Sequence, residues 1–406
     1  MKTQNLLRCS PILLMVFIAC KPAIPPDELW LGEANIAEGR TIPFRLELDL
    51  SSDPPSGAFL VSNDRTPIPE IAVRGDSIIL MISEYDAAIR LSWNGQNLVG
   101  RYERYRSDTT GMAVSASPAV ALEKPEPSTN LFPLVGTFRV WQVADEGADT
   151  SSSAVFWSRG DSVFGTVVAP SGDDGLFAGV QSGDTVRLAR FTGWQSIYME
   201  IIRDGFDWEG RRFMRELPPD SFRLARRASA EPFTPSSRTT RLKPGLTSFT
   251  FSGVTPDGDT LTDKSERFRG KALIVDIMGT WCHNCLDAAP VLQRLYEEFG
   301  PRGLEVVSLA FELTDDPVTA SKNLRLFADR HGVTYPLLFT GDLSSENVRS
   351  RIGSQLEHFG AYPTTLFIDR SGRIRNIHKG FRGPGTADGF QREVEYFIEH
   401  AREITQ

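Results

Sequence analysis

Two cysteines separated by two residues, Cys282 and Cys285, are the part of this sequence whose types and spacing could do chemistry. Such a pair can be a redox couple, half of a zinc site or a small structural disulfide. Structural zinc almost always takes four ligands, but the chain has no second cysteine pair and its histidines are isolated. A disulfide closing so small a loop removes little entropy from the unfolded chain. The spacing therefore favours a redox-active dithiol that needs no metal and no other cofactor.

The start of the chain indicates export. An apolar run at 12–19 follows a basic start and precedes Cys20. The run is far shorter than the roughly 20 residues that a membrane-spanning helix needs, so it predicts a signal peptide over residues 1–19. The segment Phe17–Cys20 is similar to a bacterial lipobox, so we expect lipidation of Cys20 and a tether over residues 20–28. An ordinary cleaved leader with a chance cysteine is the alternative, and it also places the protein on the periplasmic side of a bacterial membrane.

Composition limits the remaining possibilities. Cys9 would leave with the leader, so the exported chain keeps Cys282 and Cys285 as its only unmodified thiols. A secreted protein held together by disulfides would have more cysteines. The 406 residues suffice for two or three domains, and the formal net charge of -8 offers none of the basic surface that nucleic acid requires. Nucleic acid is therefore excluded as a partner.

Residues 29–225 alternate short apolar runs with turn residues, which predicts an all-β antiparallel barrel or sandwich with few helices. A Gly-Asp pair followed by a hydroxyl residue recurs at 75–77, 160–162 and 183–185, and each copy has the composition of a hairpin turn. Similar spacings suggest two related halves. Their expected bounds are 29–121 and 131–224.

A linker rich in proline and serine is expected over residues 226–244, followed by an α/β domain over 245–406. The nearly continuous apolar runs at 271–277 and 304–311 predict strands buried on both faces. Helical spacing follows the cysteines at 285–299 and recurs at 318–331 and 386–404. Runs at 364–369 and 373–378 predict a hairpin. The cysteine pair thus falls where a central strand meets the next helix.

That position makes chemical sense. The N-terminus of a helix offers unpaired N–H groups and about half a positive charge, so a thiolate placed there is stabilised. Cys282 is the residue so placed and is expected to be the nucleophile. Cys285, one turn into the helix, would be the resolving thiol.

Several separated motifs make the resemblance to a family specific. The segment 276–285, Asp-Ile-Met-Gly-Thr-Trp-Cys-His-Asn-Cys, and the later 362–372, Tyr-Pro-Thr-Thr-Leu-Phe-Ile-Asp-Arg-Ser-Gly, resemble the thioredoxin superfamily. Within it the match is to TlpA/ResA-like disulfide reductases, which are exported and often anchored to a membrane. The resemblance covers about 246–403 and implies a thioredoxin fold.

The resemblance also implies roles for individual residues. Pro363 would be a cis-proline facing the cysteines, with Tyr362 and Thr364 beside it where a substrate segment binds. Asp276 would accept and return the proton of Cys285, although the lysine that usually accompanies it is absent from 304–311. Glu312 matches a glutamate near the cysteines of ResA-like proteins, and an exposed glutamate at a strand end is the alternative.

Two neighbours of the nucleophile complete the expected site. Trp281 would shield the thiolate and give partners an apolar platform, or else be a plain core aromatic. His283, if protonated, would favour the Cys282 thiolate further, and an exposed, inert imidazole is the alternative.

The function expected from these residues is a thiol-disulfide oxidoreductase that reduces disulfides of exported proteins. Export into an oxidising space requires regeneration, and the resemblance implies a membrane thiol electron donor. A disulfide-forming oxidase is one alternative. Another is a binding lipoprotein whose β-rich region carries the main function. Copper delivery would predict a wider cysteine spacing and a nearby histidine ligand.

Overall fold

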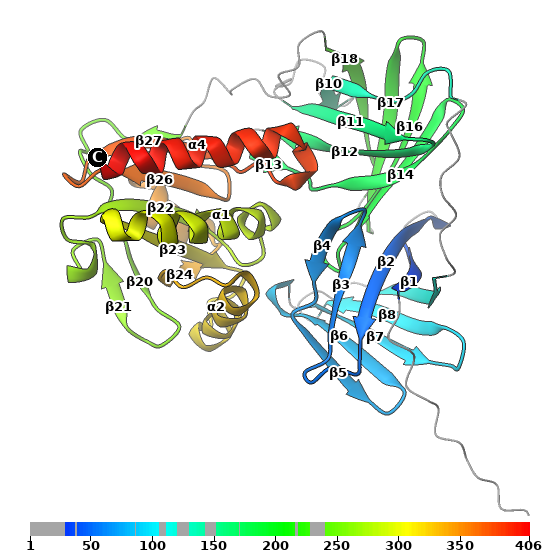
Figure 1. Ribbon diagram of the computed structural model, residues 1–406, viewed down its shortest axis with the longest axis horizontal. Coiled ribbons are helices and arrows are strands. Elements are labelled where there is room, and N and C mark those ends of the chain that lie inside the picture. The colour runs from blue at the N-terminus through cyan, green and yellow to red at the C-terminus, as the bar shows by residue number, and fades with distance from the viewer. Residues whose placement is uncertain are drawn as a thin grey trace, which may run out of the picture.

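The computed structural model describes residues 29–36, 39–85, 87–104, 111–119, 130–142, 152–169, 171–215, 218–227 and 240–406. The predicted signal peptide (1–19), the predicted lipidation site Cys20 and the tether (20–28) lie outside these residues, as does most of the predicted linker. Figure 1 shows a β-rich region on one side of the molecule and an α/β domain on the other.

The first sheet is a curled, antiparallel half-barrel in the order β4-β3-β2-β1-β9-β8-β7-β6-β5. In β2 the apolar residues Ile42, Phe44 and Leu46 alternate with polar ones, so one face of the strand is buried. The end strands β4 and β5 form no ladder with each other among the described residues, so the sheet stays open. The strands are β1 (Leu29–Asn35), β2 (Thr41–Asp49), β3 (Ser56–Val61), β4 (Asp64–Pro67), β5 (Glu70–Arg74), β6 (Ser77–Ile82), β7 (Ala87–Trp93), β8 (Leu98–Arg104) and β9 (Met112–Pro118).

The second sheet closes into a barrel. Its order is β11-β10-β18-β17-β16-β15-β14-β12-β13, and an additional pairing of β11 with β12 joins the two sides, leaving the short β13 outside the ring. Of the barrel and sandwich alternatives, the barrel is confirmed. The strands are β10 (Gly136–Gln142), β11 (Ser153–Arg159), β12 (Ser162–Ala169), β13 (Gly172–Asp173), β14 (Phe177–Ser182), β15 (Thr185–Phe191), β16 (Ser196–Asp204), β17 (Asp207–Met214) and β18 (Asp220–Arg226).

The three Gly-Asp repeats are hairpin turns, as predicted. They connect β5 with β6, β11 with β12, and β14 with β15. Gly75, Gly160 and Gly183 have φ of 66°, 61° and 59°, a left-handed conformation that favours glycine. The repeat is therefore a turn signature.

Half-barrel and barrel share one core cluster, in which Phe191 and Phe213 of the barrel join the apolar face of the half-barrel. Phe44 stacks on Phe191 with ring centroids 4.6 Å apart. Two ion pairs also join the halves, Arg40 with Glu200 at 3.2 Å and Arg190 with Asp64 at 2.9 Å. The β-rich region is thus held together across its two sheets.

The α/β domain has a seven-stranded sheet in the order β21-β20-β24-β23-β22-β26-β27. The central strands β22, β23 and β24 are parallel, whereas β26 runs antiparallel to β22. One face packs against α1, α2 and α4 in a shared apolar cluster. The strands of this sheet are β20 (Ser252–Val254), β21 (Thr260–Thr262), β22 (Ala272–Met278), β23 (Leu304–Glu312), β24 (Leu337–Asp342), β26 (Thr364–Ile368) and β27 (Ile374–Lys379). The short strands β19 (Arg241–Leu242) and β25 (Leu356–Glu357) pair with each other in a separate two-stranded sheet.

The helices that matter for the site are α1 (His283–Phe299), α2 (Pro317–His331) and α4 (Asp388–Thr405). They correspond to the three helical segments expected from the sequence, and the domain has the expected thioredoxin-like α/β fold. Shorter helical segments are η2 (Ser83–Tyr85), η3 (Glu266–Phe268), η4 (Gly300–Arg302), α3 (Ser345–Val348), η5 (Arg349–Gly353) and η6 (Pro384–Thr386).

Candidate active site

The two cysteines lie where β22 turns into α1. Cys282 is the N-cap residue of α1 and Cys285 lies in its first turn, with the Cys285 amide donating to the Cys282 carbonyl at 3.0 Å. Both are free thiols, and Cys282 and Cys285 are 7% and 2% exposed. The N-terminal end of the helix dipole therefore acts directly on Cys282.

A cis peptide bond lies opposite the nucleophile. The bond between Tyr362 and Pro363 is cis, and the Cys282 thiol donates a hydrogen bond to the Tyr362 carbonyl oxygen at 3.3 Å. The loop is held from both sides, since Thr364 Oγ1 donates to Ala361 O at 2.8 Å and the Gly380 amide donates to Pro363 O at 2.8 Å. Three residues expected from the resemblance, Tyr362, Pro363 and Thr364, thus lie together beside the dithiol.

Asp276 is buried in the middle of β22, at 2% exposure. Its register partners are Ser308 on β23 and Thr365 on β26. Thr365 Oγ1 donates to its carboxylate at 3.0 Å and Ser308 Oγ at 3.4 Å. Burial raises the pKa of Asp276 to about 7, although both hydrogen bonds lower it. The carboxyl group is therefore poised to exchange a proton near neutral pH.

The resolving thiol, Cys285, is buried near the same carboxyl group, Asp276. Burial raises the pKa of Cys285 well above its ordinary value, and the hydrogen bond with Cys282 and the charge of Asp276 raise it further. Cys285 thus needs a proton acceptor before it can attack.

Hydroxyl groups surround the Asp276 carboxylate on the neighbouring strands. Ser308 occupies the β23 position next to Asp276, and it also hydrogen-bonds Tyr335, whose pKa is raised by burial and by the Asp276 charge. The sequence analysis missed Ser308, Thr365 and Tyr335. The strand register around Asp276 is the signal that identifies the first two.

Glu312 ends β23 and is completely buried, so the alternative of an exposed glutamate is wrong. Its carboxylate accepts from the Thr280 amide at 3.0 Å and from Thr280 Oγ1 at 2.7 Å. Thr280 lies two residues before the nucleophile. Glu312 therefore holds the turn that presents Cys282.

Trp281 lies between the two parts of the molecule. It is half-buried and packs against the core clusters of both the half-barrel and the α/β domain. Its indole N–H donates to Phe311 O at 2.8 Å, and its ring meets Tyr362 edge-on at 5.4 Å. The geometry fits the expected apolar shield, and the ring faces the β-rich region.

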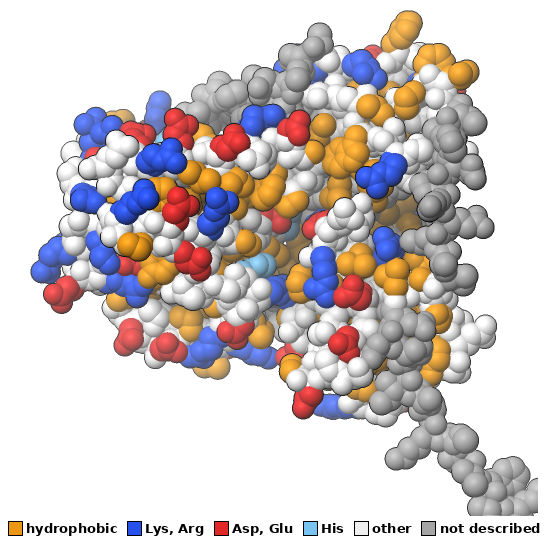
Figure 2. Space-filling model, viewed as in Figure 1, with side chains coloured by type: hydrophobic (Ala, Val, Ile, Leu, Met, Phe, Trp, Pro, Cys, Tyr) orange, Lys and Arg blue, Asp and Glu red, His pale blue; other side chains and the backbone are white. Residues whose placement is uncertain are grey.

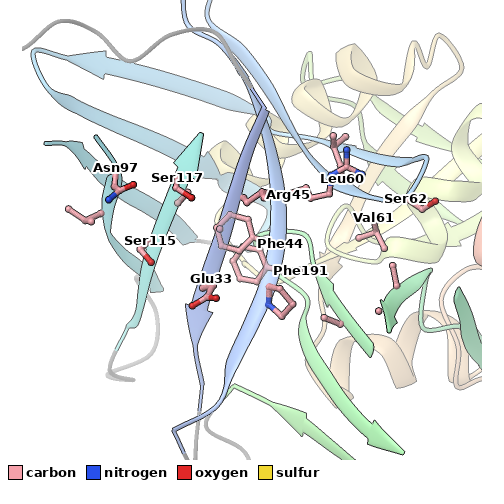
Figure 3. A pocket seen from close by; sticks show the side chains of 18 residues that line it. Glu33, Phe44, Arg45, Leu60, Val61, Ser62, Asn97, Ser115, Ser117 and Phe191 are labelled. Carbon is pink, nitrogen blue, oxygen red and sulfur yellow. The ribbon is translucent and has the colours of Figure 1, made fainter. Parts of the chain in front are cut away.

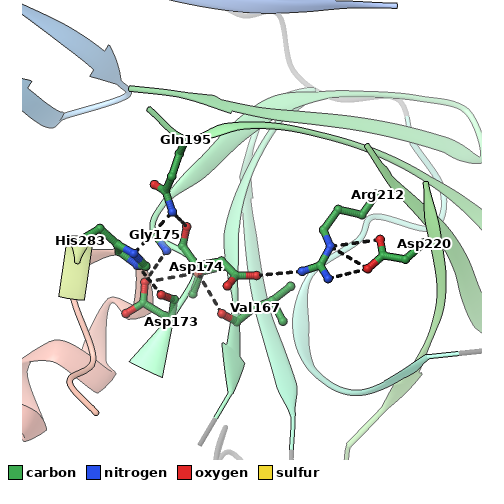
Figure 4. A network of polar contacts seen from close by, with 9 residues as sticks. Val167, Asp173, Asp174, Gly175, Gln195, Arg212, Asp220 and His283 are labelled. Carbon is green, nitrogen blue, oxygen red and sulfur yellow. Dashed lines mark hydrogen bonds and ion pairs between the residues drawn. The ribbon is translucent and has the colours of Figure 1, made fainter. Parts of the chain in front are cut away.

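His283 requires a correction. Its ring is neither protonated nor exposed and inert, because it packs against the barrel: Nε2 bonds the Asp173 carbonyl and Nδ1 lies 3.5 Å from Gln195 Nε2 (Figure 4). Burial lowers the pKa of His283 to about 3, and the nearby Arg190 guanidinium contributes. The ring is therefore neutral at pH 7 and supplies no positive charge to Cys282.

The sequence analysis also missed residues of the β-rich region that reach the dithiol. The Tyr85 hydroxyl donates to the carbonyl oxygen of Trp281, and Trp194 stacks on Tyr85 with centroids 4.3 Å apart. Trp194 also lies 5.7 Å from the His283 ring. Nothing local in the sequence could have signalled contacts between residues so far apart in the chain.

In the described part of the chain, no group of three or more His, Cys, Asp or Glu side chains is arranged to hold a metal ion. None of the helices within the described ranges is long and apolar enough to cross a membrane. The face shown in Figure 2 carries acidic and basic side chains side by side.

Comparison with known proteins places this site in a recognisable class. The AhpC/TSA family model matches residues 248–377, so the C-terminal region holds an AhpC/TSA thioredoxin-like domain. Thioredoxin-like protein YneN of Bacillus subtilis is 30% identical over 112 residues, covering 28% of this chain and 58% of that protein. Thiol-disulfide oxidoreductase ResA of Geobacillus kaustophilus is 28% identical over 131 residues, covering 32% of this chain and 64% of that protein.

These relatives are distant, and the chain spans about three-fifths of their length. Among solved structures, a thiol:disulfide interchange protein of the thioredoxin family from Chlorobium tepidum is similar, with 23% identity and a TM-score of 0.31, covering 40% of this chain and 97% of that one. A second protein from Chlorobium tepidum, described as a DsbE-type interchange protein, has 19% identity and a TM-score of 0.32, covering 41% of this chain and 100% of that one.

Proposed function

We propose that this protein is an exported, membrane-anchored thiol-disulfide oxidoreductase that reduces disulfides of extracytoplasmic proteins. The observation that carries the proposal is the placement of Cys282 at the start of α1, 3.3 Å from the Tyr362 carbonyl of the cis-proline loop, with Cys285 one turn behind it. The ResA relatives, whose names state thiol-disulfide oxidoreductase activity, support it. Lipidation at Cys20 would supply the anchor.

The proposed reaction moves two electrons from the dithiol to the substrate. The Cys282 thiolate attacks one sulfur of a substrate disulfide, forming a mixed disulfide and releasing the other substrate sulfur as a thiolate that takes up a proton. Asp276 then accepts the proton of Cys285. The Cys285 thiolate attacks Cys282 Sγ, closing the protein disulfide and releasing the second substrate sulfur as a thiolate that takes up a proton. A membrane thiol electron donor would reduce the Cys282–Cys285 disulfide again.

The test is a trapping experiment with the full chain. Cys285→Ser leaves the nucleophile but removes the resolving thiol, so a substrate protein should remain bound through a disulfide to Cys282. Cys282→Ser is the matched control and should trap nothing. The proposal fails if no adduct forms and the wild-type protein reduces neither insulin nor glutathione disulfide.

The direction of electron flow is separately measurable. A reduction potential near thioredoxin's roughly -270 mV supports a reductase, whereas a value near roughly -120 mV supports a disulfide-forming oxidase.

A second candidate function rests on a cavity in the β-rich region. A cavity of about 600 Å³ lies between the half-barrel and the barrel, and its lining includes the stacked rings of Phe44 and Phe191 and the charged residues Glu33 and Arg45 (Figure 3). Its volume is within the range of small-molecule sites, roughly 300 to 1,000 Å³. A binding lipoprotein would use this cavity. Mass spectrometry of the purified full chain under non-denaturing conditions tests it, since a protein that carries no small molecule from its host argues against binding.

A further inference from the structure

The surface around the dithiol is not free, because the β-rich region covers it. In Figure 2 the side chains of the two parts meet along a seam, and Figure 4 shows the polar contacts that cross it from the barrel to His283. Three segments of the β-rich region take part: η2, the turn at 192–195 between β15 and β16, and the segment 171–176 around β13.

The segment 171–176 lies close to the backbone of the α/β domain. Asp173 Oδ2 accepts a hydrogen bond from the Gly383 amide at 2.5 Å, and Asp173 Oδ1 accepts from the Gly175 amide at 2.7 Å. A methyl group added at Gly380 would lie 2.6 Å from the carbonyl carbon of Ser171. Gly380 in turn donates to Pro363 O, so this segment lies next to the cis-proline loop.

The same segment also covers the residues between the cysteines. The Asn284 amide nitrogen lies 3.5 Å from Ser171 O, and His283 bonds the Asp173 carbonyl. On the other flank, Tyr85 and Trp194 form a stacked aromatic pair over Trp281 and His283. The chain neighbours of Cys282 are therefore contacted from two sides by residues more than 85 positions earlier in the chain.

This cover conflicts with what a protein substrate needs. A substrate chain must bring a disulfide sulfur into line with Cys282 Sγ and lie along the Tyr362 backbone, yet the nucleophile is 7% exposed. We propose that the β-rich region is an intramolecular cap whose segment 171–176 occupies the substrate surface, so that protein disulfides are reduced only after the cap lifts away. The inference rests on the proposed function and names a form of regulation for the same site.

The chemistry of the interface suits reversible contact. Polar groups take part in it, since the carboxylates of Asp173 and Asp287 both lie beside Gly383, within 3.3 Å and 2.1 Å of the position a Cβ atom would take there. The Asn284 side-chain oxygen is buried without a hydrogen-bond partner among the described residues. Interfaces between domains of one chain that are polar and imperfectly paired resemble transient ones and separate readily. Lifting the cap would return these groups to water.

A steric wedge at Gly385 tests the cap from the side of the α/β domain. A methyl group there would lie 2.8 Å from the Leu176 amide nitrogen and 3.0 Å from the Gly175 carbonyl carbon, and Gly385 has no positive φ that would make alanine strained. Gly385→Ala should therefore weaken docking. Gly300→Ala is the matched control, because Gly300 has helical φ and ψ of -53° and -46° and open space around its Cβ position.

The readout is the rate at which iodoacetamide alkylates Cys282 in the reduced full chain, followed by mass spectrometry. The wedge should speed alkylation about tenfold, which corresponds to docking weakened by about 1.4 kcal/mol, while the control matches the wild type.

A second variant weakens docking from the barrel side, so the cap can still be tested if Gly385→Ala fails to fold. Asp173→Asn keeps the size of the side chain, but its single carbonyl oxygen can accept from only one of the Gly175 and Gly383 amides. Asp174→Asn is its control, since the Asp174 carboxylate pairs with Arg212 within the barrel. Asp173→Asn should raise the alkylation rate and Asp174→Asn should not. Equal rates in wild type and in both folded docking variants overturn the cap.

Reduction of insulin and of bis(2-hydroxyethyl) disulfide then separates the cap from the proposed function. The cap predicts that both docking variants reduce insulin several-fold faster than wild type, with a smaller change for the small disulfide. Faster alkylation with unchanged insulin reduction overturns the cap as the barrier to protein substrates, while the reductase remains. Faster alkylation in a protein that reduces neither disulfide means that the proposed function fails and the cover stands.

Discussion

Thr365 donates a hydrogen bond to Asp276 at 3.0 Å across the ladder between β22 and β26. This bond stabilises a carboxylate that burial otherwise disfavours, and burial dominates, since the pKa of Asp276 is about 7. Charge at this position is thus costly to the fold and useful to the chemistry.

The first prediction concerns stability and pH in Asp276→Asn. The folded pKa is raised from 3.8 to about 7, so folding takes up a proton between these values and wild-type stability falls as pH rises through them. One pKa unit corresponds to about 1.4 kcal/mol, so at pH 8 the free energy of unfolding of Asp276→Asn should rise relative to that of the wild type by up to roughly 4 kcal/mol. At pH 4 the difference between the two proteins should change little. Urea unfolding of both full chains across this range measures it.

The control for that measurement is Asp329→Asn, because Asp329 is an exposed residue of α2 in the same domain. Its unfolding free energy should follow the wild type at every pH. Parallel curves for Asp276→Asn and wild type would contradict the prediction.

The second prediction concerns the kinetics of the same variant. Because burial raises the pKa of Cys285, the resolving step should depend on Asp276 as proton acceptor. In wild type the rate should rise with pH up to about 7 and then level off, following the Asp276 carboxyl. Loss of a general base typically slows a step by about 10² to 10⁴, and in Asp276→Asn the rate should keep rising above pH 8. Stopped-flow measurement of mixed-disulfide decay checks this, and a rate unchanged at pH 7 would count against the role.

The sequence identified what is local in this site. A nearly continuous apolar run located β22 and helical spacing located α1, so the helix start at Cys282 could be predicted, and motif resemblance located the cis-proline loop at Pro363. The charge and surroundings of His283 could not be predicted. They depend on Asp173 and Gln195 of the barrel, whose docking leaves no periodic trace in the sequence.

The surroundings of Asp276 could be predicted only in part. A lone carboxylate in an apolar strand was recognisable, but Ser308 and Thr365 become its neighbours only through strand register. Register is set by pairing between strands distant in the chain, which one sequence alone specifies weakly. The strand β24 (Leu337–Asp342), which lies between β20 and β23 in the sheet, was not anticipated either.

The third prediction concerns Gly279, which lies three residues before Cys282. A methyl group there would lie 2.2 Å from Trp281 Nε1 and 2.8 Å from Phe311 O, so Gly279→Ala must displace the indole and break its hydrogen bond. We expect a loss of about 1–3 kcal/mol in unfolding free energy and a shift in Trp281 fluorescence. Gly300→Ala, with open space at its Cβ position, should change neither. Unaltered fluorescence in Gly279→Ala would show that the indole is not fixed by this contact.

The fourth prediction concerns Glu312 and the turn that it holds. Glu312→Ala leaves the buried amide and hydroxyl of Thr280 without their acceptor, which should cost about 1–3 kcal/mol of stability. Because Thr280 precedes the nucleophile by two residues, the reaction of Cys282 with glutathione disulfide should also slow. Glu312→Gln keeps one acceptor oxygen and should recover part of both losses. Thermal melts and single-turnover rates of the three proteins measure this. If Glu312→Ala loses stability but keeps the wild-type rate at Cys282, then Glu312 supports the fold and does not position the nucleophile.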